Sequence, residues 1–154
     1  MASAELKGKI KIMVEDLIVK EGVDTFIFGS KSQFDDLCHT VVTELQKEHK
    51  NLRRIAYLCR HETGCLVGAG MNLSQKIKRF IGKEIAVKEY EEIKKCDRVN
   101  NAGRASYVER NQWMIDDSDV IIIRFDEDRK TDKQSGTAIA YAYAERKNKK
   151  VLKI

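Results

Sequence analysis

The chain has 154 residues, 34% of them charged, and its 29 Lys and Arg against 24 Asp and Glu leave a formal net charge of +5. At this length one domain can bury a substantial core, so we expect a single domain over residues 1–154. The charge excess favours anionic ligands in general. It is too small to imply a nucleic acid, and we expect no nucleic-acid partner.

The spacing of the cysteines and the hydropathy indicate in which compartment the protein is expected. The cysteines show no paired spacing, which disfavours a disulfide framework, and no apolar run is long enough to cross a membrane. We therefore expect a cytoplasmic protein that does not associate with membranes. The four cysteines are Cys38, Cys59, Cys65 and Cys96.

Apolar residues at helical spacing open the chain and predict a first helix that includes residues 6–18. A short buried strand is predicted over Thr25–Phe28. A second helical face covers residues 34–45, and Ser32 and Asp35 at its start have the spacing of a capping box. A strand followed by a capped helix is the first half of a βαβ unit.

The rest of the chain keeps switching between strand and helix spacing. In order, the pattern predicts a strand over 55–59, a helix around 73–81, a weak strand over 92–97, a helix over 105–116, a strand over 120–125, a helix over 137–147 and a closing strand over 151–154. Strands that are joined by helices run parallel and are covered on both faces. The predicted class is therefore α/β, with three layers and a parallel sheet of about five strands.

Ligands of such sheets bind outside the carboxyl ends of the strands. Three loops are expected at that edge. They follow the first, second and fourth strands and span residues 29–33, 60–70 and 126–136. Candidate site residues should lie in these loops or next to them.

The tripeptide Ser135-Gly136-Thr137 opens the last helix and is the sharpest of these candidates. A glycine there lets backbone N–H groups approach a phosphate, and the helix dipole adds about half a positive charge. The alternative is an ordinary N-cap, for which serine is a preferred residue. Gly29, Ser30 and Lys31 end the first strand and form either a tight turn or the second wall of a nucleotide cleft. The presence of both segments at one edge favours the cleft.

Arg110 and Asn111 lie on the predicted helix 105–116, beside its apolar face. From there Arg110 could reach the cleft and contact a ligand. The alternative is a surface arginine that pairs with Glu109 or Asp117.

The loop after the second strand contains His61 and Glu62, which are candidates for contacts with a ribose or a base. A zinc site would have to combine Cys59, His61 and Cys65 with one of the remaining cysteines. That spacing matches no usual zinc pattern, so we expect no metal and no cofactor.

The pattern R-N-x-x-M-I-D-x-S-D from Arg110 to Asp119, the apolar strand after it, and Ser135-Gly136-Thr137 together resemble the SLOG superfamily. This superfamily includes the LOG-type nucleoside monophosphate phosphoribohydrolases, once labelled lysine decarboxylases. The resemblance is closest to small uncharacterised members with this pattern and extends loosely over nearly the whole chain. It implies a Rossmann-like fold, a nucleotide or nucleotide-derived ligand, a homo-oligomer (a dimer or higher), and ligand contacts by Arg110, Gly136 and Thr137.

The chain departs from the LOG-type motif P-G-G-x-G-T-x-x-E at its chemically important end. The glutamate position is Ala140, and the two leading glycines are Lys133 and Gln134. Cleaving an N-glycosidic bond builds positive charge on the ribose, which a carboxylate stabilises and an alanine cannot. Four carboxylates could substitute: Asp35, Asp36, Glu62 and Glu109.

Three functions compete, in this order. The first is binding of a nucleotide signal, such as one derived from NAD or ADP-ribose, by a stand-alone sensor or sequestering protein. The second is an N-glycosidase or phosphoribohydrolase with a non-standard carboxylate. The third is a nucleic-acid binder. The missing glutamate favours binding over cleavage.

Overall fold

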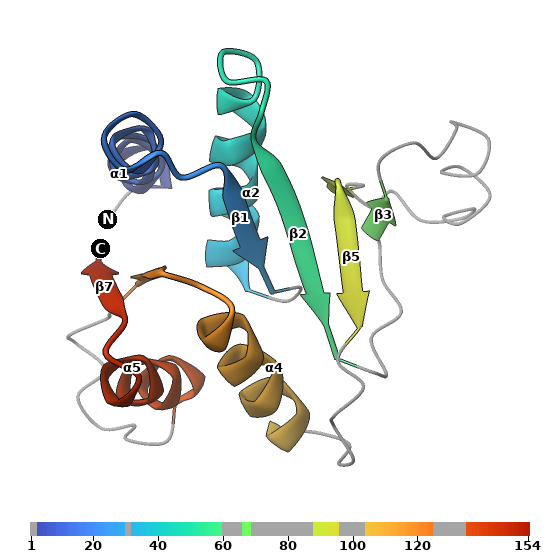
Figure 1. Cartoon of the computed structure of the whole chain (residues 1–154), viewed down its shortest axis with the longest axis vertical. Coiled ribbons are helices and arrows are strands. Elements are labelled where there is room, and N and C mark those ends of the chain that lie inside the picture. Colours follow the sequence, from blue (N-terminus) through green and yellow to red (C-terminus); the bar gives the residue numbers. More distant parts are fainter. Residues whose placement is uncertain (1–2, 30–31, 60–65, 69–87, 96–103, 125–134) are drawn as a thin grey trace.

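The computed structural model describes residues 3–29, 32–59, 66–68, 88–95, 104–124 and 135–154. Helices and strands alternate along the chain (Figure 1), which confirms the predicted α/β class. In order, the elements are α1 (Ser3–Glu21), β1 (Thr25–Phe28), α2 (Gln33–Leu45), β2 (Arg53–Leu58), β3 (Leu66–Gly68), β4 (Lys88–Tyr90), β5 (Glu92–Lys95), α4 (Arg104–Asp116), β6 (Val120–Ile123), α5 (Gly136–Arg146) and β7 (Lys150–Lys153).

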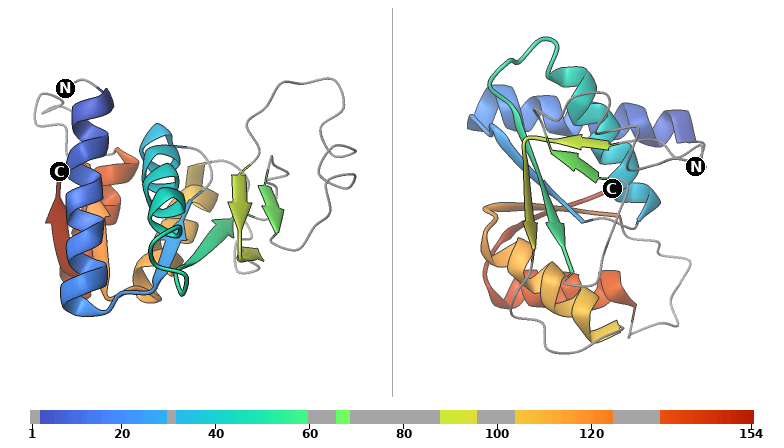
Figure 2. Two further views of the ribbon diagram at one scale, coloured as in Figure 1. Left: turned by 90° about the horizontal axis from the view of Figure 1, so that it is seen from above. Right: turned by 90° about the vertical axis from the view of Figure 1, so that its right-hand side faces the viewer.

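The elements form three layers. Helices α1 and α2 pack together on one side of the strands, and α4 and α5 pack together on the other side (Figure 2, right). Strands covered on both faces are the arrangement that a parallel sheet with helical crossovers requires. Within the described ranges, no helix is both long and apolar enough to span a membrane.

All the paired strands are parallel, as predicted, but they are divided among separate sheets. One sheet has the order β1-β2-β5, a second pairs β3 with β4, and a third pairs β6 with β7. In register, Ile27 of β1 lies opposite Ile55 of β2, and Ile122 of β6 lies opposite Leu152 of β7. The short strands β3 and β4 were not predicted, and the helix expected around 73–81 lies outside the described residues.

Local signals explain where several elements begin and end. Ser32 is the N-cap of α2, and its Oγ accepts a hydrogen bond of 2.9 Å from the Asp35 backbone N–H. Gly22 ends α1 with a positive φ of 67°, a conformation that glycine adopts without a steric penalty. The predicted helices over 34–45, 105–116 and 137–147 are thus found within one or two residues of their expected bounds.

Strand β2 starts two residues earlier than predicted. Its first two residues are arginines, which the apolar pattern used for the prediction does not include. Arg54 is only 6% exposed, yet its guanidinium is paired inside the protein: Nε donates to Glu91 Oε2 at 2.8 Å and Nη1 donates to Thr43 at 3.0 Å. A buried charge is tolerated when it is paired and hydrogen bonded. The apolar pattern that defined the predicted strand cannot anticipate pairing partners such as Glu91, between β4 and β5, and Thr43 on α2.

The main core lies between α1, α2 and the three-stranded sheet. Buried aliphatic residues of both helices pack against apolar residues of β1 and β2 there. The set is Leu6, Ile10, Val14, Phe28, Val41, Val42, Leu45, Leu52, Ala56, Leu58 and Tyr90.

His39 on α2 lies at the edge of this core, and its ring packs against those of Phe28 and Tyr90 at centroid distances of 5.5 and 4.6 Å. Its Nε2 is 2.7 Å from the carbonyl oxygen of Glu89, which can only accept, so Nε2 carries the hydrogen. Burial, and secondarily the positive charge of Arg54, lower the pKa of His39 from 6.5 to about 4. At neutral pH the imidazole is therefore uncharged.

Candidate functional site

A cleft of about 980 Å³ lies between β1 and β6, with residues of α2, α4 and α5 in its walls. Every residue of both strands lines it, and these strands belong to different sheets. The cleft therefore separates the two sheets, and the residues that line it include segments that precede and follow each of the two strands. Its central walls are apolar, while its two ends differ in charge.

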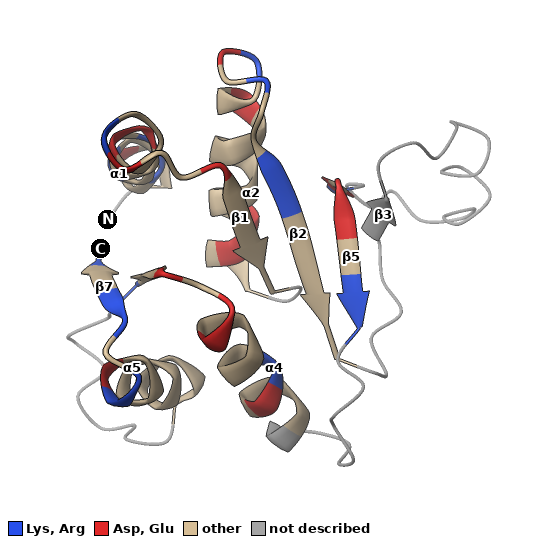
Figure 3. Cartoon of the chain, viewed as in Figure 1, with Lys and Arg blue, Asp and Glu red and all other residues tan. Residues whose placement is uncertain are grey.

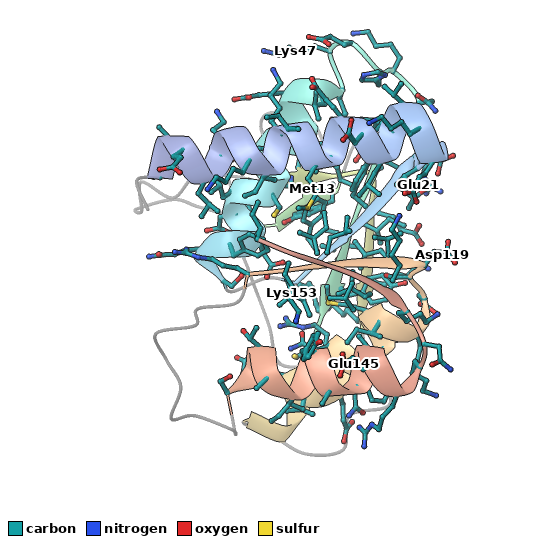
Figure 4. The ribbon with its side chains drawn as sticks, turned by 90° about the vertical axis from the view of Figure 1, so that its left-hand side faces the viewer. Met13, Glu21, Lys47, Asp119, Glu145 and Lys153 are labelled. Carbon is teal, nitrogen blue, oxygen red and sulfur yellow. The ribbon has the colours of Figure 1, made fainter. Side chains whose placement is uncertain are left out.

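The end at the start of β1 and β6 is acidic. Glu21 and Asp24 precede β1, and Asp117 and Asp119 precede β6, and all four line the cleft. Figure 4 shows Glu21 and Asp119 at the same edge of the molecule. Glu21 forms an ion pair with Lys150, and Asp117 accepts a hydrogen bond from Tyr57. Asp24 and Asp119 therefore carry the negative charge that disfavours an anionic ligand group at this end.

The opposite end contains the start of α5. Ser135 is the N-cap, and its Oγ accepts a hydrogen bond of 3.1 Å from the Ala138 backbone N–H. The backbone N–H groups of the first helical residues, Gly136 and Thr137, have no partner within the helix. Both residues are exposed and line the cleft, and a Cβ at Gly136 would meet no atom of the described residues within 4 Å. The helix start is thus open to an anion.

Arg110 of α4 reaches the same cleft from below the strands. It is only 5% exposed, so the alternative of a surface arginine is wrong. Its guanidinium carbon lies 5.4 Å from the centre of the Tyr107 ring, and its Nε donates to Asn111 Oδ1 at 3.4 Å. A cation held over an aromatic face is both oriented and partly desolvated.

Gly29 follows β1 and lies beside two groups of opposite charge. A Cβ at this position would be 3.2 Å from Arg110 Nη2 and 3.2 Å from Asp35 Oδ2. Gly29 has no positive φ, so the need for glycine here is spatial and not conformational. Its missing side chain lets the guanidinium and the carboxylate converge at the carboxyl end of β1.

Asp35 is held in place by the first turn of α2. Its Oδ2 accepts a hydrogen bond of 2.8 Å from Ser32 Oγ, in addition to the cap that Ser32 forms with its backbone N–H. The acidic residues of this turn are visible at the end of α2 nearest the end of β1 (Figure 3). Asp35 lines the cleft, whereas its neighbour Asp36 forms an ion pair with Lys88.

Cys38 lies one turn after Asp35 and also lines the cleft. Burial, and secondarily the negative charge of Asp35, raise the pKa of its thiol to about 12. The thiol is therefore protonated at neutral pH and is a poor nucleophile. Cys38 contributes an apolar wall to the cleft.

The structure brings six of the predicted site residues together. Arg110, Asn111, Ser135, Gly136 and Thr137 line the cleft, and Gly29 adjoins Arg110. Glu109 is not among the lining residues that the structure describes. Ser30, Lys31, His61 and Glu62 lie outside the described residues.

Ala140, at the position of the LOG-type glutamate, lines the same cleft as Gly136. It stands one helical turn after the glycine, on the same side of α5. No carboxylate is therefore presented from that position, and Asp35 is the acidic residue that the structure places beside Arg110.

Tyr107 and Cys38 were not proposed as cleft residues, and Asp35 was considered only as a substitute carboxylate. Each has a sufficient structural explanation in the sequence: a helix cap for Asp35 and apolar helix faces for the others. The signal that could have identified them is their position on α2, which follows β1, and on α4, which carries Arg110.

Comparison with known proteins agrees with this geometry. The family model described as the YspA SLOG family matches residues 3–154, which is nearly the whole chain. The chain belongs to the YspA SLOG family. Its SLOG membership, expected from Arg110 and the Ser-Gly-Thr helix start, is thus confirmed and points to nucleotide-related binding or activity.

The chain is also similar to the uncharacterized SPbeta prophage-derived protein YoqJ of Bacillus subtilis strain 168. It is 27% identical over 144 residues, which cover 92% of this chain and 81% of YoqJ.

Proposed function

We propose that the cleft binds a nucleotide or a nucleotide-derived signal, such as one derived from NAD or ADP-ribose, without cleaving it efficiently. The observation that carries the proposal is that the buried Arg110 and the exposed start of α5 line one cleft. Membership of the SLOG family supports the choice of a nucleotide over other anions.

The phosphate is proposed to bind at the start of α5. Backbone N–H groups of Gly136 and Thr137 would donate to its oxygens, and the helix dipole favours the negative charge. Arg110 would add a planar, bidentate donor that suits a phosphate. The acidic end of the cleft, at Asp24 and Asp119, leaves the α5 end as the favourable position for the anion.

The role that fits such a site is that of a stand-alone sensor or a protein that sequesters the signal. We propose that residues 1–154 act as one domain in the cytoplasm and assemble into a homo-oligomer. Light scattering at micromolar concentration tests the assembly, and a monomer there would contradict it.

Binding is preferred to cleavage because Ala140 cannot stabilise the positive charge that develops on the ribose. One observation keeps an N-glycosidase as the second candidate: Asp35 presents a carboxylate to the same cleft. The two functions differ in what is recovered after incubation with a nucleotide.

A thermal-shift screen of AMP, GMP, CMP, UMP, NAD and ADP-ribose, followed by chromatography of each mixture, tests the proposal. We expect at least one compound to raise the melting temperature and to be recovered intact. A released base or ribose phosphate, lost in Asp35→Asn, would establish the N-glycosidase. No stabilisation by any of the compounds would contradict nucleotide binding.

A further inference from the structure

We infer that Asp35 recognises the ribose hydroxyls of the bound nucleotide, so that the cleft selects ribonucleotides over deoxyribonucleotides. The inference rests on the proposed function, because it names the part of that ligand which α2 contacts. The starting point is the pair of opposite charges around Gly29, where the Arg110 guanidinium and the Asp35 carboxylate approach the same point to 3.2 Å.

The two charged groups suit different parts of a sugar phosphate. A phosphate needs donors and positive charge, which Arg110 and the start of α5 provide. It would be repelled by Asp35. A ribose diol presents hydroxyl donors, and a carboxylate accepts hydrogen bonds from them. The ligand that satisfies both groups carries a phosphate and neighbouring hydroxyls within one short segment.

Asp35 retains the capacity to accept these bonds. An ionised carboxylate has about four lone-pair sites, and the bond of 2.8 Å that Ser32 Oγ donates to Oδ2 occupies one of them. The same bond, together with the N-cap of α2, fixes the orientation of the side chain.

The alternative is that Asp35 serves only to cap α2 and to balance the charge of Arg110. Both explanations predict that removing the carboxylate weakens nucleotide binding. Only the direct contact predicts that the loss depends on the hydroxyls of the ligand. The discriminating measurement therefore compares ligands with and without a diol in the same variants.

Asp36 provides a matched control. It lies in the same turn and carries the same charge, but it pairs with Lys88 and does not line the cleft. Asp36→Asn removes the same charge from the same helix as Asp35→Asn. Asparagine keeps an acceptor oxygen for Ser32 Oγ, so the cap of α2 is retained in Asp35→Asn.

The experiment is calorimetric titration of wild type, Asp35→Asn and Asp36→Asn with the tightest-binding nucleotide of the screen and with its 2′,3′-dideoxy analogue. Hydrogen bonds to a charged group predict that wild type binds the dideoxy analogue about tenfold or more weakly. In Asp35→Asn this preference should fall to about threefold or less through weaker binding of the ribonucleotide. Asp36→Asn should keep it.

Equal affinity of wild type for the two ligands would overturn the inference and leave nucleotide binding intact. So would an unchanged preference in Asp35→Asn, which would assign Asp35 to capping and charge balance. If Asp35→Asn fails to fold, the wild-type comparison with the 2′-deoxy and 3′-deoxy analogues still decides whether hydroxyls are recognised. Absence of nucleotide binding by wild type would overturn both proposals.

Discussion

Gly29 and Arg110 show how single residues shape the end of the cleft. The glycine leaves room for the guanidinium, and the ring of Tyr107 holds that guanidinium in place. Burial of Arg110 to 5% exposure keeps its charge in a region where electrostatic attraction to a phosphate is stronger than in water. The contribution of each residue to nucleotide binding can therefore be tested by a conservative substitution.

Replacing Gly29 with alanine should weaken nucleotide binding while the fold is kept. The added methyl would be 3.2 Å from the Arg110 and Asp35 side chains, so one of them must shift. We expect a loss of about 1 kcal/mol or more in both stability and binding, measured by urea denaturation and calorimetry. The control is Gly8→Ala in the exposed part of α1, where a Cβ meets nothing within 4 Å. That change should raise stability by about 0.5–1 kcal/mol and leave binding unchanged.

Arg110→Lys should weaken nucleotide binding by about 1–3 kcal/mol, because lysine cannot reproduce a planar bidentate contact. Arg146→Lys is the matched control, since Arg146 is exposed at the end of α5 and lies over the Tyr143 ring. Titration calorimetry gives both affinities. Unchanged affinity in Arg110→Lys would remove this residue from the ligand contacts.

At the scale of elements, the sequence predicts helices better than sheets. Ser32 and Ser135 mark helix starts because each satisfies a backbone N–H in its own first turn. Pairing of β1 with β2 or of β6 with β7 depends on distant residues and could not be assigned from spacing. The burial of Arg54 and the convergence of Asp35 with Arg110 likewise need the tertiary structure.

Two substitutions at the start of α5 separate its contribution to protein stability from its contribution to nucleotide binding. Gly136→Val should abolish most nucleotide binding at a stability cost of about 1 kcal/mol or less, because the side chain enters open space and the backbone φ is not positive. Ser135→Ala should instead cost about 1 kcal/mol of stability through the lost N-cap. Denaturation and calorimetry on both variants give the comparison. Normal binding by Gly136→Val would place the phosphate elsewhere.

At the scale of the whole molecule, the free energy of unfolding depends on an uncharged His39, a residue of α2 that packs against the core. The pKa of His39 is about 4 in the folded protein and 6.5 in the unfolded chain, so the unfolded chain binds more protons between these values. The stabilisation is complete above pH 6.5 and is lost as the pH falls toward 4. The free energy of unfolding should therefore decrease with acidification in this window.

His39→Gln should flatten that decrease, because glutamine can donate to the Glu89 carbonyl and does not titrate. Urea denaturation at intervals from pH 7 to pH 4 provides the profile. We expect the wild type to lose on the order of 2 kcal/mol more than the variant across the window. Parallel profiles would show that His39 is protonated equally in both states.

The division of the strands into two main sheets separated by a cleft is the feature from which the proposed function follows. It separates the acidic residues Asp24 and Asp119, which precede the strands, from Arg110 and Gly136, where we propose that the anion binds. The α/β class and the ligand edge follow from the sequence, but this polarity requires the positions of both sheets.

The most direct test is a crystal structure with the nucleotide that stabilises the protein most. The account predicts an intact ligand whose phosphate oxygens accept hydrogen bonds from the first backbone N–H groups of α5 and from the Arg110 guanidinium. A phosphate bound at the acidic end, or outside the cleft between β1 and β6, would contradict it.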